Sequence, residues 1–242
     1  MRGAVEVSQQ ALAKVVNRMD NVLSQSPLFA SLDDNAAAAL ISTLTEQRVN
    51  KGEILFHEGE PGDHLYVIVE GKVKLGHASA DGRESLMAVL GPGEMFGELS
   101  LFDPGLRTST ATALTVARVY RMGNTQLMPW LAGRPEVAAA LLQALARRLR
   151  RTNEAMADLV FSDVPGRVAK ALMELGEKFG TMTTAGLLVT HDMTQEELAQ
   201  LVGASRETVN KALADFAQRG WIQLESRQVL ILDVERLGKR AR

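Results

Sequence analysis

Residues 194–216, TQEELAQLVGASRETVNKALADF, constrain the fold more than any other part of the chain, because helix-start and turn signals recur in them at short spacing. Thr194 and Glu197 form a capping-box pattern, which predicts a helix that begins after Thr194. The tight turn that follows is expected at Gly203, since glycine adopts positive φ at little steric cost. Ser205 then predicts the N-cap of a second helix. The segment therefore predicts two short helices that meet at an angle.

The two predicted helices divide their residues between a facing side and an outward side. The facing sides are apolar and comprise Leu198, Ala199, Val202, Val209, Ala212 and Leu213. On the outward side, Arg206 suits guanine O6/N7, Glu207 suits cytosine N4, and Lys211 suits a guanine or a phosphate. A helix-turn-helix that binds DNA is the preferred interpretation, and a helical hairpin with a solvated polar face is the alternative. The residues assigned to DNA binding are Thr194, Gln195, Ser205, Arg206, Glu207, Asn210 and Lys211.

A hairpin is expected after the two helices. Residues 221–224 and 229–232 are apolar runs that flank the polar residues 225–228. This pattern predicts two antiparallel strands, the wing of a winged helix-turn-helix. Arg227 at the tip is expected to touch a phosphate.

A long helix is expected after the Arg134-Pro135 breaker. Its apolar seam repeats with spacings of 3, 4, 3, 4 and 3 along Leu142, Leu145, Leu149, Thr152, Met156 and Leu159. Such spacing is typical of a coiled coil, and the flanking arginines at 147, 148, 150 and 151 favour a narrow stripe between two copies. We therefore expect a dimer, with a helix packed on its own domain as the alternative. Thr152 is polar at a seam position and is followed by Asn153, which marks a candidate ligand contact.

A hinge is expected at residues 163–166, DVPG, since proline removes a backbone donor and glycine permits unusual torsions. Asp163 can cap the next helix, whose apolar face includes Val168 and Leu172. A second compact domain is therefore expected to begin at residue 163.

The region from residue 48 to residue 121 has a different pattern. Short apolar runs occur at residues 54–56, 65–69, 72–75 and 116–120, and 10 of the 20 glycines lie between Gly52 and Gly105. Short strands with glycine-rich corners predict a small antiparallel sandwich or barrel that encloses a space. Helices are expected before it, over residues 4–24 and from Asp33 to Thr45.

Residues 96–111, FGELSLFDPGLRTSTA, look like a phosphate cradle between two strands. Gly97 lets backbone N–H groups approach an anion, Arg107 can pair with a phosphate, and Thr108 adds a hydroxyl donor. A short helix, whose N-terminus favours negative charge, is expected to open with Leu99 and Ser100. Glu98 suits the role of acceptor for a ribose 2′-hydroxyl. A cyclic nucleotide, which carries a ribose and a phosphate, therefore fits both Glu98 and Arg107. The alternative is an internal Glu98–Arg107 ion pair that stabilises the loop.

Composition excludes several classes of protein. The 242-residue chain has no cysteine, which excludes disulfides, thiolate-bound iron–sulfur clusters, cysteine-rich zinc sites and a cysteine nucleophile. Its net charge is −2, and residues 163–242 hold 11 Lys/Arg against 11 Asp/Glu, so DNA binding has to rest on the local motif. With no apolar run of about 18 residues and no signal-peptide pattern, we expect a cytoplasmic protein.

The glycine-punctuated β segment, the FGELSLFDPGLRTSTA cassette, the heptad helix and the SRETVNK segment follow one another in this order. In this the chain resembles the cyclic AMP receptor protein / catabolite activator family, within the CRP/FNR regulators, over roughly residues 26–235. The resemblance implies an α+β fold with a cyclic-nucleotide-binding β-roll (jelly-roll-like), a long dimerisation helix and a C-terminal winged helix-turn-helix. The corresponding bounds are 26–134, 135–162 and 163–242, after an N-terminal helical extension at 1–25.

The resemblance also implies cyclic AMP as an allosteric ligand, with no metal and no catalytic cofactor. Thr152 would meet the adenine amino group, and Arg148 would lie near the base. Asn153 stands where the family often has a serine that reaches the adenine in the partner subunit. The full set implied for the ligand is Gly97, Glu98, Leu99, Ser100, Arg107, Thr108, Arg148, Thr152 and Asn153.

For DNA, the resemblance aligns Arg206, Glu207 and Lys211 with residues that read a GTGA-type half-site, where arginine is common at the last position. Lysine replaces a planar fork by a point charge, so discrimination at that base pair is expected to differ. Two copies on a C2 axis would present their recognition helices about 34 Å apart, one turn of DNA. The implied partners are a palindromic double-stranded DNA, a second copy of the chain and RNA polymerase.

The main alternative is a regulator of the same fold with another effector, such as haem, or with none. Each histidine is expected to be an ordinary loop or surface residue: His57, His64, His77 and His191. A cupin-type enzyme would need clustered histidines, and neither Ser100 nor Ser109 lies near a histidine in sequence, so we predict no catalysis. A nucleotide-binding regulatory module for a protein partner would have no need of residues 194–216.

Overall fold

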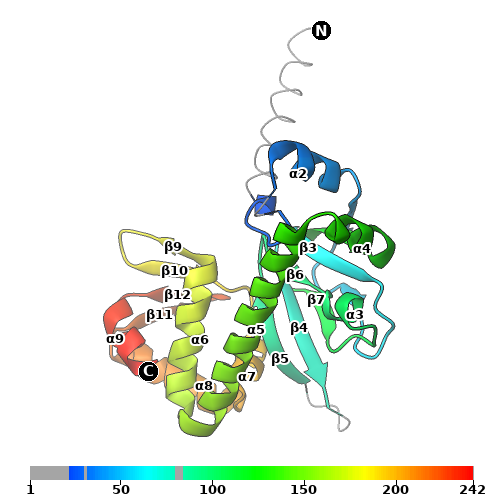
Figure 1. Ribbon diagram of the computed structural model, residues 1–242. Coiled ribbons are helices and arrows are strands. Elements are labelled where there is room, and N and C mark those ends of the chain that lie inside the picture. The colour runs from blue at the N-terminus through cyan, green and yellow to red at the C-terminus, as the bar shows by residue number, and fades with distance from the viewer. Residues whose placement is uncertain (1–21, 30–31, 80–83, 242) are drawn as a thin grey trace. The chain divides into compact units, whose positions relative to one another are not determined.

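The computed structural model describes residues 22–29, 32–79 and 84–241 (Figure 1). The helix predicted over residues 4–24 lies almost wholly outside the described residues. The chain divides into two compact units, each described here by itself: Met1–Val73 with Leu90–Arg147, and Lys74–Val89 with Arg148–Arg242. None of the helices in the described ranges is long and apolar enough to cross a membrane.

The first described helix is shorter than predicted. Helix α2 (Asp34–Ile41) has Asp33 as its N-cap, whose carboxylate accepts a hydrogen bond from the Ala36 N–H. It ends at Ile41 rather than Thr45, because the Ser42 and Thr43 hydroxyls donate to carbonyls of the last turn at 2.7 Å each. Strand β1 then begins at Thr45, so the prediction of helix up to that residue was wrong.

The β region consists of short strands in two sheets among the described residues. One has the order β1-β8-β3-β6, with the bounds β1 Thr45–Val49, β3 His64–Glu70, β6 Met95–Phe96 and β8 Ala117–Gly123. The other has the order β2-β7-β4-β5, with the bounds β2 Ile54–Phe56, β4 Val73–Ala78, β5 Glu84–Leu90 and β7 Thr110–Ala113. Four of these strands occupy the predicted apolar runs, and alternate residues of β3 point into the core because side chains on a strand alternate between faces.

Helices α4 (Asn124–Ala132) and α5 (Pro135–Phe161) follow β8. The sequence did not predict α4, whereas the long helix after the Arg134-Pro135 breaker is confirmed. The first turns of α5 bury Val137 and Leu141 in the core of the first unit. The predicted seam is half-buried at Leu145 and otherwise exposed, at Leu142, Leu149, Thr152, Met156 and Leu159.

The C-terminal part of the second unit packs helices on a four-stranded sheet of order β11-β12-β10-β9. The helices are α6 Val164–Phe179, α7 Gln195–Val202, α8 Arg206–Gln218 and α9 Val234–Arg240, and the strands are β9 Gly180–Met182, β10 Leu187–Thr190, β11 Ile222–Glu225 and β12 Gln228–Ile231. Asp163 caps α6 as predicted. The predicted hairpin is confirmed, although its strands extend to Glu225 and Gln228 and leave a turn at residues 226–227. The sequence did not predict β9, β10 or α9.

Candidate functional site

Gly97 opens the phosphate cassette just after β6 and has φ +77°, a backbone conformation that the sequence had not predicted. A Cβ atom at this position would lie 2.8 Å from Arg107 Nη1 and 3.1 Å from the His64 carbonyl oxygen. No other residue therefore fits without a shift of the surrounding chain. Helix α3 (Leu99–Phe102) follows, which confirms the predicted short helix.

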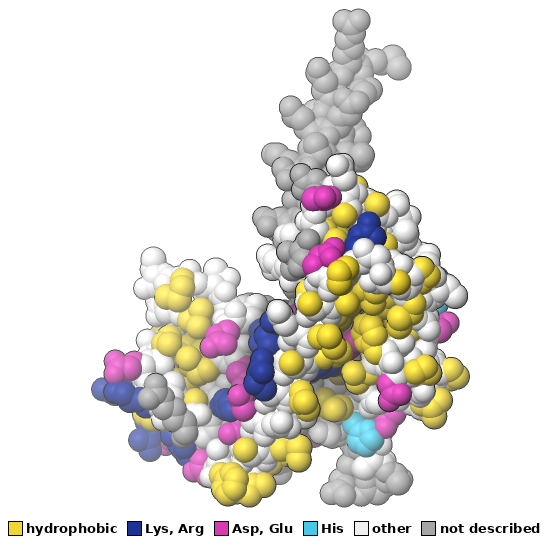
Figure 2. All heavy atoms as spheres, viewed as in Figure 1, with side chains coloured by type: hydrophobic (Ala, Val, Ile, Leu, Met, Phe, Trp, Pro, Cys, Tyr) yellow, Lys and Arg dark blue, Asp and Glu magenta, His cyan; other side chains and the backbone are white. Residues whose placement is uncertain are grey.

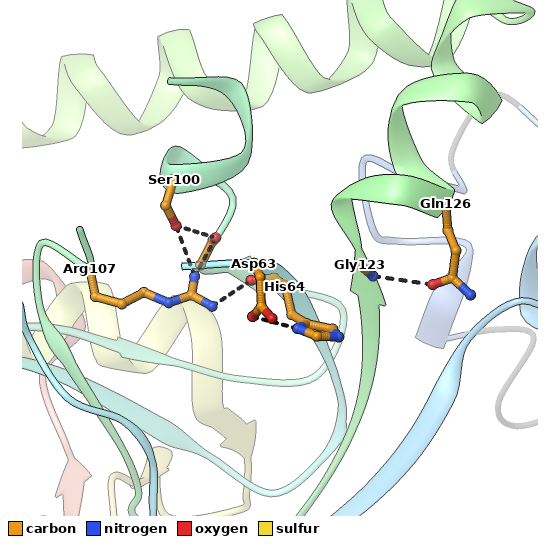
Figure 3. A network of polar contacts seen from close by, with 7 residues as sticks. Asp63, His64, Ser100, Arg107, Gly123 and Gln126 are labelled. Atoms are coloured by element: carbon orange, nitrogen blue, oxygen red, sulfur yellow. Dashed lines mark hydrogen bonds and ion pairs between the residues drawn. The ribbon is translucent and has the colours of Figure 1, made fainter. Parts of the chain in front are cut away.

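Arg107 is the centre of the cassette and is 5% exposed. Its Nη1 donates to the Gly97 carbonyl at 2.7 Å and to Ser100 Oγ at 3.1 Å, and its Nη2 donates to the His64 carbonyl at 2.8 Å (Figure 3). The guanidinium also lies over the ring of Phe56, 4.2 Å from the ring centroid. Three neutral acceptors and an aromatic face thus hold a buried cation in one orientation.

Burial lowers the pKa of Arg107 from its usual value, and the nearby charges of Asp63 and Glu98 oppose that shift. An arginine nevertheless stays protonated in proteins. Its Nε is buried and makes no hydrogen bond to any described residue. A positive charge with an unused buried donor favours an anion with an oxygen to offer.

The other cassette residues differ in exposure. Glu98 is 1% exposed and Ser100 is buried, whereas Leu99 and Thr108 are exposed. Figure 2 shows hydrophobic side chains gathered over α3 on the face in view, and the exposed apolar residues of this segment are Leu99, Phe102 and Leu106. Because the side chain of Leu99 is apolar, this residue can contact a polar ligand only through its backbone N–H.

Three contributors to the cradle are not predictable from the sequence. Phe56 and the His64 backbone hold Arg107, as described above. A Cβ atom at Gly62 would lie 2.0 Å from Ser100 Oγ and 3.0 Å from Arg107 Cζ. No sequence pattern links these residues to Arg107, because each acts through a contact between distant parts of the chain. His64 Nδ1 also lies 2.6 Å from Asp63 Oδ1, a hydrogen bond that lowers the pKa of Asp63 (Figure 3).

The remaining residues assigned to the ligand lie on α5, in the other unit. Thr152 and Asn153 are exposed, and Arg148 is half-buried. The Thr152 hydroxyl donates to the Arg148 carbonyl at 3.1 Å within its own helix. This local bond satisfies the hydroxyl, so the polar seam position does not by itself require a ligand.

The two helices of the DNA-reading motif begin and turn as the sequence predicted. Thr194 Oγ1 accepts from the Glu197 N–H at 3.1 Å, and Glu197 Oε2 accepts from the Thr194 N–H at 2.7 Å. Gly203 has φ +70°, and Ser205 Oγ accepts from the Thr208 N–H at 3.2 Å. The predicted facing side is buried at all six positions: Leu198, Ala199, Val202, Val209, Ala212 and Leu213.

The outward face of α8 carries fewer residues than predicted. Arg206, Glu207 and Lys211 are exposed, and Lys211 Nζ lies 2.7 Å from Glu207 Oε1, one helical turn away. Asn210 is instead half-buried, and its Oδ1 is buried with no hydrogen bond to a described residue. Asn210, which the sequence assigned to DNA binding, therefore lies at the boundary between the outward face and the buried face that carries Val209.

The wing is tied to the loop before α7. Asp192 and Arg227 both have positive φ, +62° and +61°. The Asp192 N–H donates to the Arg227 carbonyl at 3.0 Å, and Arg227 Nη1 donates to the Asp192 carbonyl at 3.2 Å. A groove of about 500 Å³ lies beside the wing, and its polar lining includes Thr194, Gln195, Arg206, Ser226, Arg227 and Gln228. Of the predicted DNA contacts, Thr194, Gln195, Arg206 and Arg227 therefore line one groove, whereas Ser205, Glu207, Asn210 and Lys211 lie outside its lining.

Within the described part of the chain, no group of three His, Cys, Asp or Glu residues could hold a metal ion. His57 and His77 are exposed and His64 is half-buried. His191 lies in the loop before α7, within the predicted class of loop or surface residues, but it is buried there, and its Nδ1 accepts a hydrogen bond from the Met193 N–H at 3.1 Å. It stabilises the turn that leads into α7.

Two family models match the chain, a cyclic nucleotide-binding domain over residues 46–133 and a Crp-like helix-turn-helix domain over residues 166–240. The CRP-like cAMP-activated global transcriptional regulator of Mycobacterium tuberculosis is 57% identical over 93% of this chain and 100% of its own length. The cyclic AMP receptor protein of Thermus thermophilus is 34% identical over 82% of this chain and 89% of its own. The structure of FixK2 from Bradyrhizobium japonicum has a TM-score of 0.74 and 25% identity, and covers 82% of this chain and 98% of that one.

The cassette and the helix-turn-helix lie inside the two matched regions, and the relatives named above cover most of the chain. The name of the Mycobacterium tuberculosis relative describes a regulator of transcription. The protein therefore belongs to the CRP/FNR family of transcription regulators, with a cyclic nucleotide-binding domain and a Crp-like DNA-binding helix-turn-helix domain.

Proposed function

We propose that the chain is a cyclic-AMP-responsive, homodimeric regulator that recognises a two-fold GTGA-type operator. The observation that carries the proposal is the buried Arg107, whose guanidinium is held by neutral acceptors while its Nε–H has no partner among the described residues. A cyclic phosphate would supply the missing acceptor and neutralise the charge. Gly97 and Ser100 would offer donors beside it, and Glu98 would accept the ribose 2′-hydroxyl.

The choice of cyclic AMP draws on the relatives, one of which is named a cAMP-activated regulator and the other a cyclic AMP receptor protein. The adenine would lie near Arg148, Thr152 and Asn153 of α5. In the proposed mechanism, contact between the base and α5 changes how two copies of this helix pack near the hinge at residues 163–166 and so reorients the DNA-binding domains. Ligand binding and DNA binding are then coupled reciprocally.

The exposed seam of α5 supports the homodimer. Its exposed large apolar residues recur at heptad spacing and are Leu142, Leu149, Met156 and Leu159, followed by Val160 and Phe161. Phe161 is 86% exposed. A stripe of this kind is costly in water unless a second helix covers it, and the arginines beside it keep the pairing surface narrow.

DNA recognition is assigned to α8 and its surroundings. Arg206, Glu207 and Lys211 are exposed on one helix face, where they can reach base edges in a major groove. Thr194, Gln195 and Ser205 lie at helix N-termini, which favour phosphate contacts. RNA polymerase is the further partner that the resemblance to the family implies.

The test is a calorimetric titration of the full chain with cyclic AMP, with cyclic GMP and AMP as controls. Binding to a two-fold GTGA-containing duplex is then measured with and without saturating ligand. Saturable binding of cyclic AMP together with tighter DNA binding is the expected result. DNA binding with no response to any nucleotide would leave a regulator of the same family with another effector or none.

A further inference from the structure

The hinge at residues 163–166 is bonded to a part of the chain far away in sequence. Asp163 Oδ1 accepts from the Gly166 N–H at 2.9 Å as the N-cap of α6. Both Asp163 oxygens also accept from Nη2 of Arg240, at 2.7 and 2.5 Å, across 77 positions of sequence. One carboxylate thus joins the start of α6 to the end of α9.

Helix α9 holds Arg240 in place independently of this ion pair. Leu237, one turn earlier, is fully buried, and Asp233 caps the helix by accepting from the Arg236 N–H at 2.9 Å. A Cβ atom at Gly166 would lie 3.2 Å from Arg240 Nη1 and 3.5 Å from the Arg240 carbonyl oxygen. The two helices therefore approach each other closely at the hinge, where a glycine leaves room for the arginine.

The neighbouring residue, Arg167, ties the hinge to the DNA-reading motif. Its Nη1 donates to the Ser162 carbonyl at the end of α5, at 2.7 Å. Its Nε and Nη2 donate to the carbonyls of Val202 and Gly203, the turn between α7 and α8, at 3.0 and 3.2 Å. The start of α6 thus has an anchor on each side, α9 through Asp163 and the helix-turn-helix through Arg167.

We propose that Arg240 is a positioning residue for the ligand response, because its pair with Asp163 holds the start of α6 rigid between α5 and the helix-turn-helix. A displacement at the end of α5 then moves the DNA-reading helices instead of being absorbed by torsions at residues 163–166. The inference rests on the proposed function, since it concerns how nucleotide binding reaches the DNA surface.

The test compares the full-length wild type with Arg240→Gln, Asp163→Asn and the double variant. Asparagine caps a helix about as well as aspartate, so Asp163→Asn removes the ion pair and leaves the N-cap. Arg236→Gln is the matched control, since Arg236 lies on the same helix in an ion pair with Asp233 that does not touch the hinge. The measured quantity is the ratio of operator affinities with and without saturating cyclic AMP.

Each single variant is expected to lower this ratio about three- to tenfold, the double variant no further than either single one, and the control less than twofold. Amide hydrogen exchange in the first turn of α6 should be faster in both single variants. A variant ratio equal to that of the wild type would overturn the inference. If both operator affinities had fallen equally, the role of the ion pair would be purely structural. A wild-type ratio of one would overturn the proposed function itself, and the inference with it.

Discussion

The ligand cradle and the DNA-reading surface differ in how they hold their basic side chains. Arg107 is buried and held by two backbone carbonyls, a hydroxyl and an aromatic ring. Arg206 and Lys211 are exposed on a helix whose caps and apolar face fix the backbone but leave the side-chain ends in solvent. The cradle therefore holds its ligand-binding cation in one fixed orientation before the ligand arrives. The DNA-reading side chains adopt their final orientation only when they contact DNA. Substitutions should act nearly all-or-none in the first region and by degrees in the second.

The largest effect is expected from Arg107→Leu. Losing the charge and its donors should weaken cyclic AMP binding by roughly 100-fold or more, because the ligand phosphate would be left without its counter-charge in a buried site. Calorimetry measures the affinity, and sedimentation checks that the dimer persists. Arg121→Leu, an exposed arginine on β8, is the control and should bind as the wild type does. Unchanged affinity in Arg107→Leu would contradict the assignment of the cradle.

A smaller, graded loss is expected from Arg206→Ala. Removing a bidentate contact to guanine should cost about 1–3 kcal/mol of specific binding, with little loss on an unrelated duplex. Fluorescence anisotropy on operator and scrambled duplexes gives both numbers. Arg219→Ala, at the far end of α8, should lose much less. If Arg206→Ala weakened both duplexes equally, Arg206 would be a phosphate contact and not a base reader.

Lys211→Arg should sharpen recognition modestly. A planar fork can bond two guanine acceptors at once where lysine offers a point charge, so discrimination at one base pair is expected to rise by up to about tenfold. The exposed pair with Glu207 offers little resistance, since such i,i+4 pairs contribute about 0.3–0.5 kcal/mol. Competition between duplexes that differ at each half-site position would locate the change. A uniform gain on all duplexes would show that residue 211 meets the backbone.

The smallest effect concerns the pH dependence of the free energy of unfolding. Each of the two units has an aspartate with a lowered pKa. The pKa of Asp63 is lowered by the His64 side chain, and that of Asp163 by the Arg240 side chain. A lowered folded-state pKa stabilises the protein above the unfolded value near 3.9, and this contribution is lost as the pH falls through the folded pKa. Because Asp163 is largely exposed, the contribution is at most about 1 kcal/mol.

Thermal unfolding of the wild type and Asp163→Asn from pH 7 to pH 3 measures this contribution. The wild type should be slightly more stable at pH 7, and the difference should shrink as the pH falls below about 4, through the lowered pKa of Asp163. Unlike histidine, arginine stays charged at every pH in this range, so no second transition is expected near pH 6.5 from this pair. A difference as large at pH 3 as at pH 7 would mean that the substitution acts through packing.

Local interactions explain which predictions succeeded. The capping box of Thr194, the positive φ of Gly203 and the N-caps at Asp163 and Ser205 all depend on residues within four positions of one another. The short helix after Gly97 was predictable from the sequence because its start also depends on neighbouring residues. The end of α2 was not, because the apolar pattern continues past Ile41 while the hydroxyls of Ser42 and Thr43 close the helix.

The sequence by itself determined the helix-turn-helix, the wing, the long seam helix and the identity of Arg107 as the candidate phosphate ligand. Only the tertiary structure showed that the His64 carbonyl and the Phe56 ring orient Arg107, that His191 is buried, and that Arg240 reaches the hinge. These contacts join residues up to 77 positions apart, so no local spacing encodes them. Capping and periodicity act within a few residues of chain, whereas burial and long-range bonding depend on which elements pack together.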